Sequence, residues 1–233
     1  MPRRAVVPPV PDPDIARLAA VLADPSRVAM LDVLLDGEAH AIGTLGRRAG
    51  VSAATASSHL RKLVGANLVV VAQVGRERRV RLASADVAQV LEQLAALAAP
   101  HTRRAEIRFA RTCYDHLAGV LAIVVVDALV DRGWLARTSD NLEPAPSLFA
   151  WLADHGHPVD IRGRRPLSRA CIDWTERVPH VAGRIGAALA SVFVGERWVA
   201  RVRQSRALRV TDRGRAALAR ELGVSVARFA TRA

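Results

Sequence analysis

Two cysteines and two histidines recur in matching positions in the second half of the chain, and such side chains bind metals or exchange electrons. Cys113 and His116 are three positions apart, which places them on one face if their segment is helical. Cys171 and His180 form a second pair within a segment of similar sequence. Two thiolates and two imidazoles suit zinc in a tetrahedral shell, whereas two neighbouring thiols suit a redox-sensitive disulfide.

Packing is the third interpretation of the same four residues. A buried cysteine behaves as a small apolar residue, and each histidine could cap a helix or form a hydrogen bond. Because a repeat copies packing as readily as chemistry, the sequence alone favours this interpretation. It therefore predicts no resident cofactor, and the alternative is an effector, redox or zinc site at Cys113, His116, Cys171 and His180.

A polar helix in the first half has the composition of a surface that binds DNA. Ser52 is a good N-cap for a helix that runs to about Val64. One side of this helix is apolar, and the other carries Thr55, Ser58, His59 and Lys62. Short hydroxyl side chains let a helix approach the bases closely in the major groove, which is about 12 Å wide. Arginines at the tip of the hairpin that follows could reach the minor groove or the phosphates.

The elements around this helix predict how it is presented. Apolar spacing predicts helices at 12–23, 25–35, 41–49 and 85–99, and alternation predicts strands at 68–74 and 78–82. Asp24 caps the second helix and Pro25 suits its first turn. Three helices, a hairpin and flanking helices are typical of a winged helix-turn-helix, mainly α with a small β-hairpin wing.

Five segments of the first hundred residues carry a combined motif. They are DPSRVAML at 24–31, VS at 51–52, SSHLRKL at 57–63, NLV at 67–69 and GRERR at 75–79. Together they resemble the ArsR/SmtB family of bacterial repressors, over roughly residues 12–99. The resemblance implies a homodimer paired through the first helix and the helix after the wing. It also implies binding to double-stranded DNA at an inverted-repeat operator. The protein would release that DNA when an effector, such as a small molecule, binds.

The resemblance further implies which side chains contact DNA. Those of the recognition helix are Ser52, Thr55, Ser57, Ser58, His59, Arg61 and Lys62, and those of the wing are Arg76, Arg78 and Arg79. The metal sites familiar in the family do not carry over. The segment 41–49 has no Cys-x-Cys pair, and Asp86 lacks the histidine that would partner it. The identity of the effector is therefore not implied.

The second half of the chain contains an internal repeat. The segment 111–119 resembles 169–173 followed by 180–183, and Trp134-Leu135-Ala136-Arg137 matches Trp198-Val199-Ala200-Arg201. Repeats of this size usually pack about a pseudo-twofold axis. We expect a flexible arm at 1–11, the winged helix at 12–100, and at 101–233 a mostly helical domain of two similar units for effector sensing or oligomerisation. The tail at 207–214 predicts a strand and turn before a final helix.

Composition limits the class of protein. The 233 residues carry a formal net charge of +12, which favours polyanionic partners. Two cysteines do not make a secreted disulfide scaffold, and the Pro-rich start lacks the apolar core of a signal peptide. The apolar run 117–130 is too short to span a bilayer, so we expect a cytoplasmic protein with no membrane partner. No P-loop, nucleophile elbow or dinucleotide motif occurs, so we expect no enzyme; a C-terminal enzyme or a purely structural oligomerisation module is the alternative.

Overall fold

Locally capped helices build the first part of the molecule. The computed structural model describes residues 14–74, 77–98, 105–139, 141–163, 165–203 and 205–225, so the predicted arm at 1–11 and Arg76 lie outside the described residues. The helices are α1 Ile15–Leu22, α2 Pro25–Leu34, α3 Ile42–Arg48, α4 Ala53–Gly65 and α5 Ala85–Leu97. The carboxylate of Asp24 accepts hydrogen bonds from the first amides of α2, and the hydroxyls of Ser52 and Ser84 do the same for α4 and α5. These caps fix where the helices begin.

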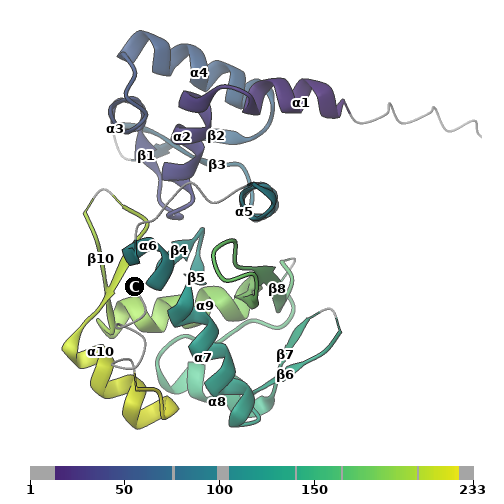
Figure 1. Ribbon diagram of the computed structural model, residues 1–233, viewed down its shortest axis with the longest axis vertical. Coiled ribbons are helices and arrows are strands. Elements are labelled where there is room, and N and C mark those ends of the chain that lie inside the picture. Colours follow the sequence, from purple (N-terminus) through teal and green to yellow (C-terminus); the bar gives the residue numbers. More distant parts are fainter. Residues whose placement is uncertain are drawn as a thin grey trace, which may run out of the picture.

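A small sheet completes this N-terminal unit, which we define as residues 14–98. Its strands are β1 His40–Ala41, β2 Val69–Val74 and β3 Glu77–Leu82. The order is β1-β3-β2 and both pairings are antiparallel, so the predicted wing hairpin gains a short third strand that the sequence did not indicate. The buried core consists of apolar side chains from α2, α3, α4 and the sheet, such as Met30, Leu31, Leu34, Leu45, Leu63, Val69 and Leu82. The predicted winged helix-turn-helix is confirmed (Figure 1).

The C-terminal unit, residues 105–225, repeats one order of elements twice after a short helix, α6 Ala105–Phe109. The first copy is β4 Arg111–Cys113, β5 His116–Ala118, α7 Val120–Asp131, β6 Leu135–Arg137, β7 Leu142–Pro144 and α8 Pro146–Asp154. The second is β8 Arg169–Ile172, β9 Pro179–Ala182, α9 Gly183–Gly195, β10 Val199–Arg201, β11 Leu208–Val210, α10 Asp212–Ala217 and a π-helical turn η1 Leu218–Leu222. Each copy is thus hairpin, helix, hairpin, helix, whereas the sequence repeat predicts two similar units but not the hairpin that opens each of them.

The helical placement of Cys113 and His116 is wrong. The segment folds as an antiparallel hairpin in which the two residues face each other across β4 and β5. Tyr114, at the turn, has a left-handed backbone with φ of 60°, which an α-helix does not allow. The helix begins only at Val120. Cys113 and His116 are still neighbours, because directly opposed residues in a hairpin lie as close as helical residues three apart.

The core of the C-terminal unit lies between the two long helices α7 and α9. Leu121, Val125 and Leu129 of α7 and Ile185 and Phe193 of α9 are almost fully buried. Three of the four tryptophans belong to this core: Trp198 is buried within it, and Trp134 and Trp151 pack against it. Within the described ranges, none of the helices combines the length and apolar character that spanning a bilayer requires.

Among the glycines described in this unit, Gly214 leaves the least room for a side chain. A Cβ atom added to Gly214 would lie 1.9 Å from the backbone oxygen of Trp198, so α10 rests directly on that peptide. We expect Gly214→Ala to lower the free energy of unfolding by about 1–3 kcal/mol, the usual cost of an overpacked site. Urea denaturation measures this. Gly195→Ala is the matched control, because its Cβ meets only His157, at 3.7 Å; equal losses in both variants would contradict the contact.

Candidate nucleic-acid interface and cysteine–histidine cluster

Helix α4 lies at the end of the molecule remote from the C-terminal unit (Figure 1). Its buried side consists of Ala56, His59 and Leu63. Helix α3 crosses closely beneath it, because a Cβ on Gly46 would come within 2.9 Å of the Ala56 Cβ. The opposite side faces outward: Ser52, Thr55, Arg61 and Lys62 are exposed, and Ser57 and Ser58 are half-buried.

Some hydroxyl groups on the outward side form hydrogen bonds within the helix or with its N-cap. The Ser52 Oγ lies 2.9 Å from the Thr55 Oγ1, and the Ser57 Oγ donates to the Ala53 carbonyl oxygen at 2.9 Å. Each hydroxyl oxygen keeps accepting capacity beyond these bonds. The outward side of α4 therefore presents short polar groups and the cations of Arg61 and Lys62.

His59 lies apart from this exposed set. Its side chain is buried, and its Nε2 atom is 3.8 Å from the Oδ1 of Asp24, the residue that caps α2. The ring thus joins α4 to the start of α2. It is therefore not part of the exposed surface of α4.

The wing presents Arg78 at its exposed end, next to the hairpin turn. Arg79 is partly held in the fold, because its guanidinium donates to the Glu77 carboxylate at 3.0 Å and to the Ala39 carbonyl oxygen at 3.4 Å. Arg76, the third predicted contact, is outside the described residues. Of the two predicted contacts that the structure describes, Arg78 is thus exposed and Arg79 is bonded to Glu77 and Ala39.

The four residues of the repeated Cys and His pairs meet between two hairpins. One ligand atom from each of Cys113, His116, Cys171 and His180 lies within 4.8 Å of the others, and all four side chains are buried. We call this set the Cys–His cluster. Its residues are directly opposed within their hairpins, on β4 with β5 and on β8 with β9. The Sγ atoms are 3.9 Å apart and the imidazole centroids 5.1 Å apart.

Carboxylates stand behind both imidazoles. The Nδ1 of His116 lies 3.4 Å from Asp115. The carboxylate of Asp115 also accepts hydrogen bonds from the two Nη atoms of Arg165. The Nδ1 of His180 lies 3.7 Å from the Oδ2 of Asp173. Among the described residues, the Nε2 atoms of both histidines and the Nδ1 of His180 are buried and have no hydrogen-bond partner.

The electrostatics of the Cys–His cluster favour one thiolate. The hydrogen bond to Cys171, together with burial, raises the pKa of Cys113. The pKa of Cys171 is lowered, because the Cys113 thiol and the two imidazoles outweigh its burial. Burial opposes protonation of His116, but Asp115 and Cys171 raise its pKa to about 9. A thiolate beside an imidazolium is the form that these neighbours stabilise.

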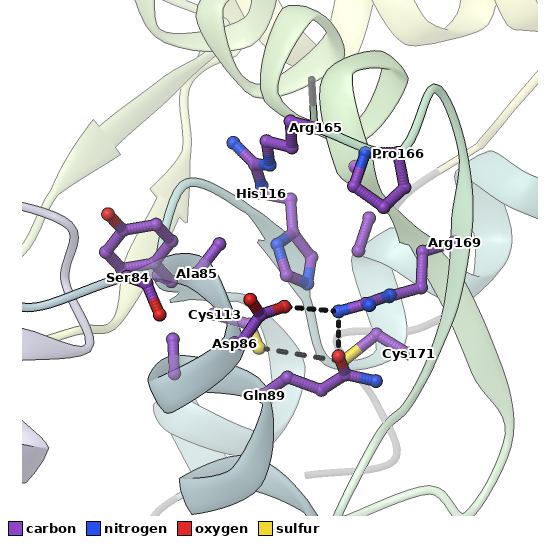
Figure 2. Close-up of a pocket in the computed structure, with 14 residues that line it drawn as sticks. Ser84, Ala85, Asp86, Gln89, Cys113, His116, Arg165, Pro166, Arg169 and Cys171 are labelled. Atoms are coloured by element: carbon purple, nitrogen blue, oxygen red, sulfur yellow. Dashed lines mark hydrogen bonds and ion pairs between the residues drawn. The ribbon is translucent and has the colours of Figure 1, made fainter. Parts of the chain in front are cut away.

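A cavity of about 340 Å³ opens beside the Cys–His cluster. Cys113, His116 and Cys171 line one wall, and α5 of the N-terminal unit supplies another (Figure 2). Arg169, two residues before Cys171, bridges the two walls: its guanidinium contacts Asp86 at 3.3 Å and also donates to Gln89 (Figure 2). The cavity therefore lies between the two units and touches both.

Sequence reasoning missed the carboxylates behind the cluster. Asp115 and Asp173 each come two residues after a cysteine, so Cys-x-Asp is itself part of the repeat. That pattern was the available signal. The ion pair of Glu92 with Arg206, which joins α5 to the C-terminal unit at 2.6 Å, has no such signal, because its members are 114 positions apart.

Known proteins resemble both parts of the chain. A model of a helix-turn-helix domain matches residues 22–72. The HTH-type transcriptional regulator YdfF of Bacillus subtilis is 37% identical over 226 residues, which cover 92% of this chain and 100% of YdfF. The regulator CmtR of Mycobacterium tuberculosis is 40% identical over 80 residues, 34% of this chain and 67% of CmtR.

Two solved structures resemble part of the chain. One is the homodimeric winged helix-turn-helix fragment of Mb0332 from Mycobacterium bovis, with a TM-score of 0.35 and 25% identity over 41% of this chain and 94% of that fragment. The other is CmtR of M. tuberculosis, described as a cadmium metal-sensor, with a TM-score of 0.32 and 38% identity over 38% of this chain and 93% of that one.

Proposed function

Because the chain belongs to the ArsR/SmtB-like family of DNA-binding helix-turn-helix transcriptional regulators, we propose that it is a homodimeric repressor. In this proposal it binds an inverted-repeat operator and leaves it when the C-terminal unit senses an effector. The observation that carries the proposal is the exposed side of α4, with its hydroxyls and the cations of Arg61 and Lys62. A helix of this shape fits the major groove, and its cations pair with phosphates.

An apolar stripe supports the homodimer. On α5 the side chains of Val90, Leu94 and Leu97 are exposed at helical spacing, with Leu97 82% exposed. On α1, Ile15 is 73% exposed. Apolar side chains aligned on one face favour burial against a partner. A twofold dimer through α1 and α5 would place two α4 helices in successive major grooves, about 34 Å apart.

Sensing, rather than catalysis, is the role proposed for the C-terminal unit. YdfF, which aligns over its whole length and therefore includes this unit, is named as a transcriptional regulator. The cavity between the units supports sensing, since anything bound there touches α5 of the N-terminal unit. A regulator that acts on the chromosome of a bacterium works in the cytoplasm, so we propose that location with it.

Loss of the α4 cations tests the proposal. We expect Arg61→Ala and Lys62→Ala each to weaken binding to the promoter fragment of the protein's own gene, and to reduce the slope of log affinity against log salt by about 1, as for one lost phosphate contact. Fluorescence anisotropy over a salt series measures both. Arg220→Ala, a matched loss of one exposed charge in η1 of the C-terminal unit, should leave the slope unchanged. Equal slopes for all variants would exclude α4 as the interface.

A further inference from the structure

We infer that the Cys–His cluster binds one thiophilic divalent ion of the Zn²⁺ type, held jointly by the two halves of the internal repeat. Each half supplies one cysteine and one histidine, from β4 and β5 in the first copy and from β8 and β9 in the second. Two sulfur and two nitrogen ligands in a closed set suit tetrahedral zinc.

The spacing of the ligand atoms supports this. With Zn–S of about 2.3 Å and Zn–N of about 2.0–2.1 Å, the ligand atoms of a tetrahedral site lie roughly 3.3–3.8 Å apart. The two Sγ atoms, 3.9 Å apart, are already near that separation, whereas a disulfide would need about 2.05 Å. All four ligand atoms lie within 4.8 Å of one another, so the cluster would contract by about 1 Å to reach the separation given by those bond lengths.

The surroundings of the imidazoles fit ligation through Nε2. A metal-bound histidine commonly directs its other ring nitrogen to a carboxylate, which fixes the ring and its tautomer. Asp115 lies in that place, 3.4 Å from the Nδ1 of His116, and Asp173 lies near the Nδ1 of His180, at 3.7 Å and without a hydrogen bond. The Nε2 atoms are then left buried without a partner, and such an atom is costly unless something accepts its lone pair.

Charge balance also favours a divalent ion. Two thiolates carry −2, so a divalent ion makes the site neutral, whereas two thiolates alone would be an uncompensated charge in a buried site. The apolar residues buried against the cysteines are Ala118 and Ala182, and the buried charges nearest Cys113, Glu92 and Arg206, are paired with each other. The cavity lined by Cys113, His116 and Cys171 provides a route by which the ion enters.

The ion would be sensed through the contacts between the units; this step rests on the proposed function. Arg169, on the same strand as Cys171, contacts Asp86 and Gln89 of α5. The amide of Tyr114, beside Cys113, donates to the Leu35 carbonyl oxygen at the end of α2 at 2.6 Å. Contraction of the cluster around an ion would pull both hairpins, and with them α5 and α2, which support the DNA-binding face.

Metal titration of the reduced, metal-free full chain tests the site. We expect one Zn²⁺ per chain, protection of both thiols from alkylation, and a thiolate-to-metal absorption band when Co²⁺ is the probe. His180→Ala should lower the affinity by at least about 100-fold, since even losing a residue that only orients a ligand costs 10–100-fold. His157→Ala, which removes a half-buried histidine outside the cluster, should bind as the wild type does.

Several results would overturn the site. They are no stoichiometric uptake, thiols that stay equally reactive with Zn²⁺ present, or wild-type affinity in His180→Ala. The thiol-protection assay on the wild-type chain decides the question even where His180→Ala fails to fold. A Cys113–Cys171 disulfide that forms under mild oxidation, with no metal uptake after reduction, would replace the metal site by a redox pair.

Anisotropy with and without Zn²⁺ tests the sensing step separately. We expect saturating Zn²⁺ to change the DNA affinity of the wild type by about 5- to 150-fold, the usual range of coupling between sites, and to leave that of His180→Ala unchanged. Equal DNA affinity of the metal-free and loaded wild type overturns the sensing step. Absence of any DNA binding in both forms overturns the proposed function, and the metal titration then still stands by itself.

Discussion

Asp173→Ala should lower the free energy of unfolding by about 3–5 kcal/mol, because it leaves the guanidinium of Arg111 buried without its charge partner. Both side chains are fully buried, and the Nη2 of Arg111 lies 3.0 Å from the Oδ2 of Asp173. A loss of this size is a large share of the 5–15 kcal/mol that holds a typical domain folded. Urea denaturation followed by circular dichroism measures it.

Asp173 also organises the loop between β8 and β9. Its carboxylate accepts hydrogen bonds from the backbone amides of Gly119, Thr175 and Glu176 and from the hydroxyl of Thr175. Although burial opposes it, the charge of Arg111 together with these bonds holds the pKa of Asp173 well below its ordinary value. The side chain thus joins the first copy of the repeat, through Gly119 and Arg111, to the second.

Two variants separate charge from shape at this position. Asp173→Asn keeps the size and one acceptor oxygen, so we expect a smaller loss, of about 1.5–3 kcal/mol, that reflects the charged hydrogen bonds. Asp127→Ala removes a carboxylate from a half-exposed pair with Arg137 and should change stability by about 1 kcal/mol or less. If Asp173→Ala were no worse than Asp127→Ala, the buried pair would not contribute as described.

The sequence predicted best those elements whose signals are local. Asp24, Ser52 and Ser84 are caps that act within three residues of themselves, so the starts of α2, α4 and α5 could be placed from the chain alone. The hairpin of β4 and β5 lacks such a signal. Its turn residues Tyr114 and Asp115 are not the Asn-Gly or Asp-Gly pair typical of short turns, and the spacing of three fits a helix equally well.

The members of the Cys–His cluster could be grouped from sequence only because the chain repeats itself. Residues at equivalent positions of two similar units meet where the units pack together, and Cys113 and Cys171 are such a pair. Contacts without a repeat or a local pattern could not be predicted. Arg111 and Asp173 are 62 positions apart, and only the tertiary fold makes them partners.

A second large loss of stability is expected where the N-terminal and C-terminal units meet. Arg206, buried between β10 and β11 of the C-terminal unit, donates to Glu92 of α5 at 2.6 Å and to Asp32 of α2 at 2.9 Å. It also donates to the Thr112 carbonyl oxygen next to Cys113, at 3.3 Å. These carboxylates outweigh burial and raise the pKa of Arg206. One guanidinium thus connects the hairpin of the Cys–His cluster to the two helices that support the DNA-binding face.

Glu92→Ala should therefore destabilise the whole chain by about 3 kcal/mol or more, since it leaves Arg206 buried with only the exposed Asp32 as a charged partner. The double variant Glu92→Leu/Arg206→Met should recover most of that loss, because replacing both members of a buried pair by apolar residues is often neutral. Glu196→Ala, in the exposed pair with Arg213, should cost about 1 kcal/mol or less. Thermal and urea unfolding of all three would give the comparison.

The double variant also separates stability from communication. In it, the other contacts between the units remain, such as that of Arg169 with Asp86, but the charged link of Arg206 to α5 and α2 is gone. We expect it to bind DNA with near wild-type affinity and to show a smaller change in that affinity when an effector binds the C-terminal unit. A double variant that folds as stably as the wild type and responds to the effector in full would show that the signal crosses the junction elsewhere, through Arg169 and the wall of the cavity.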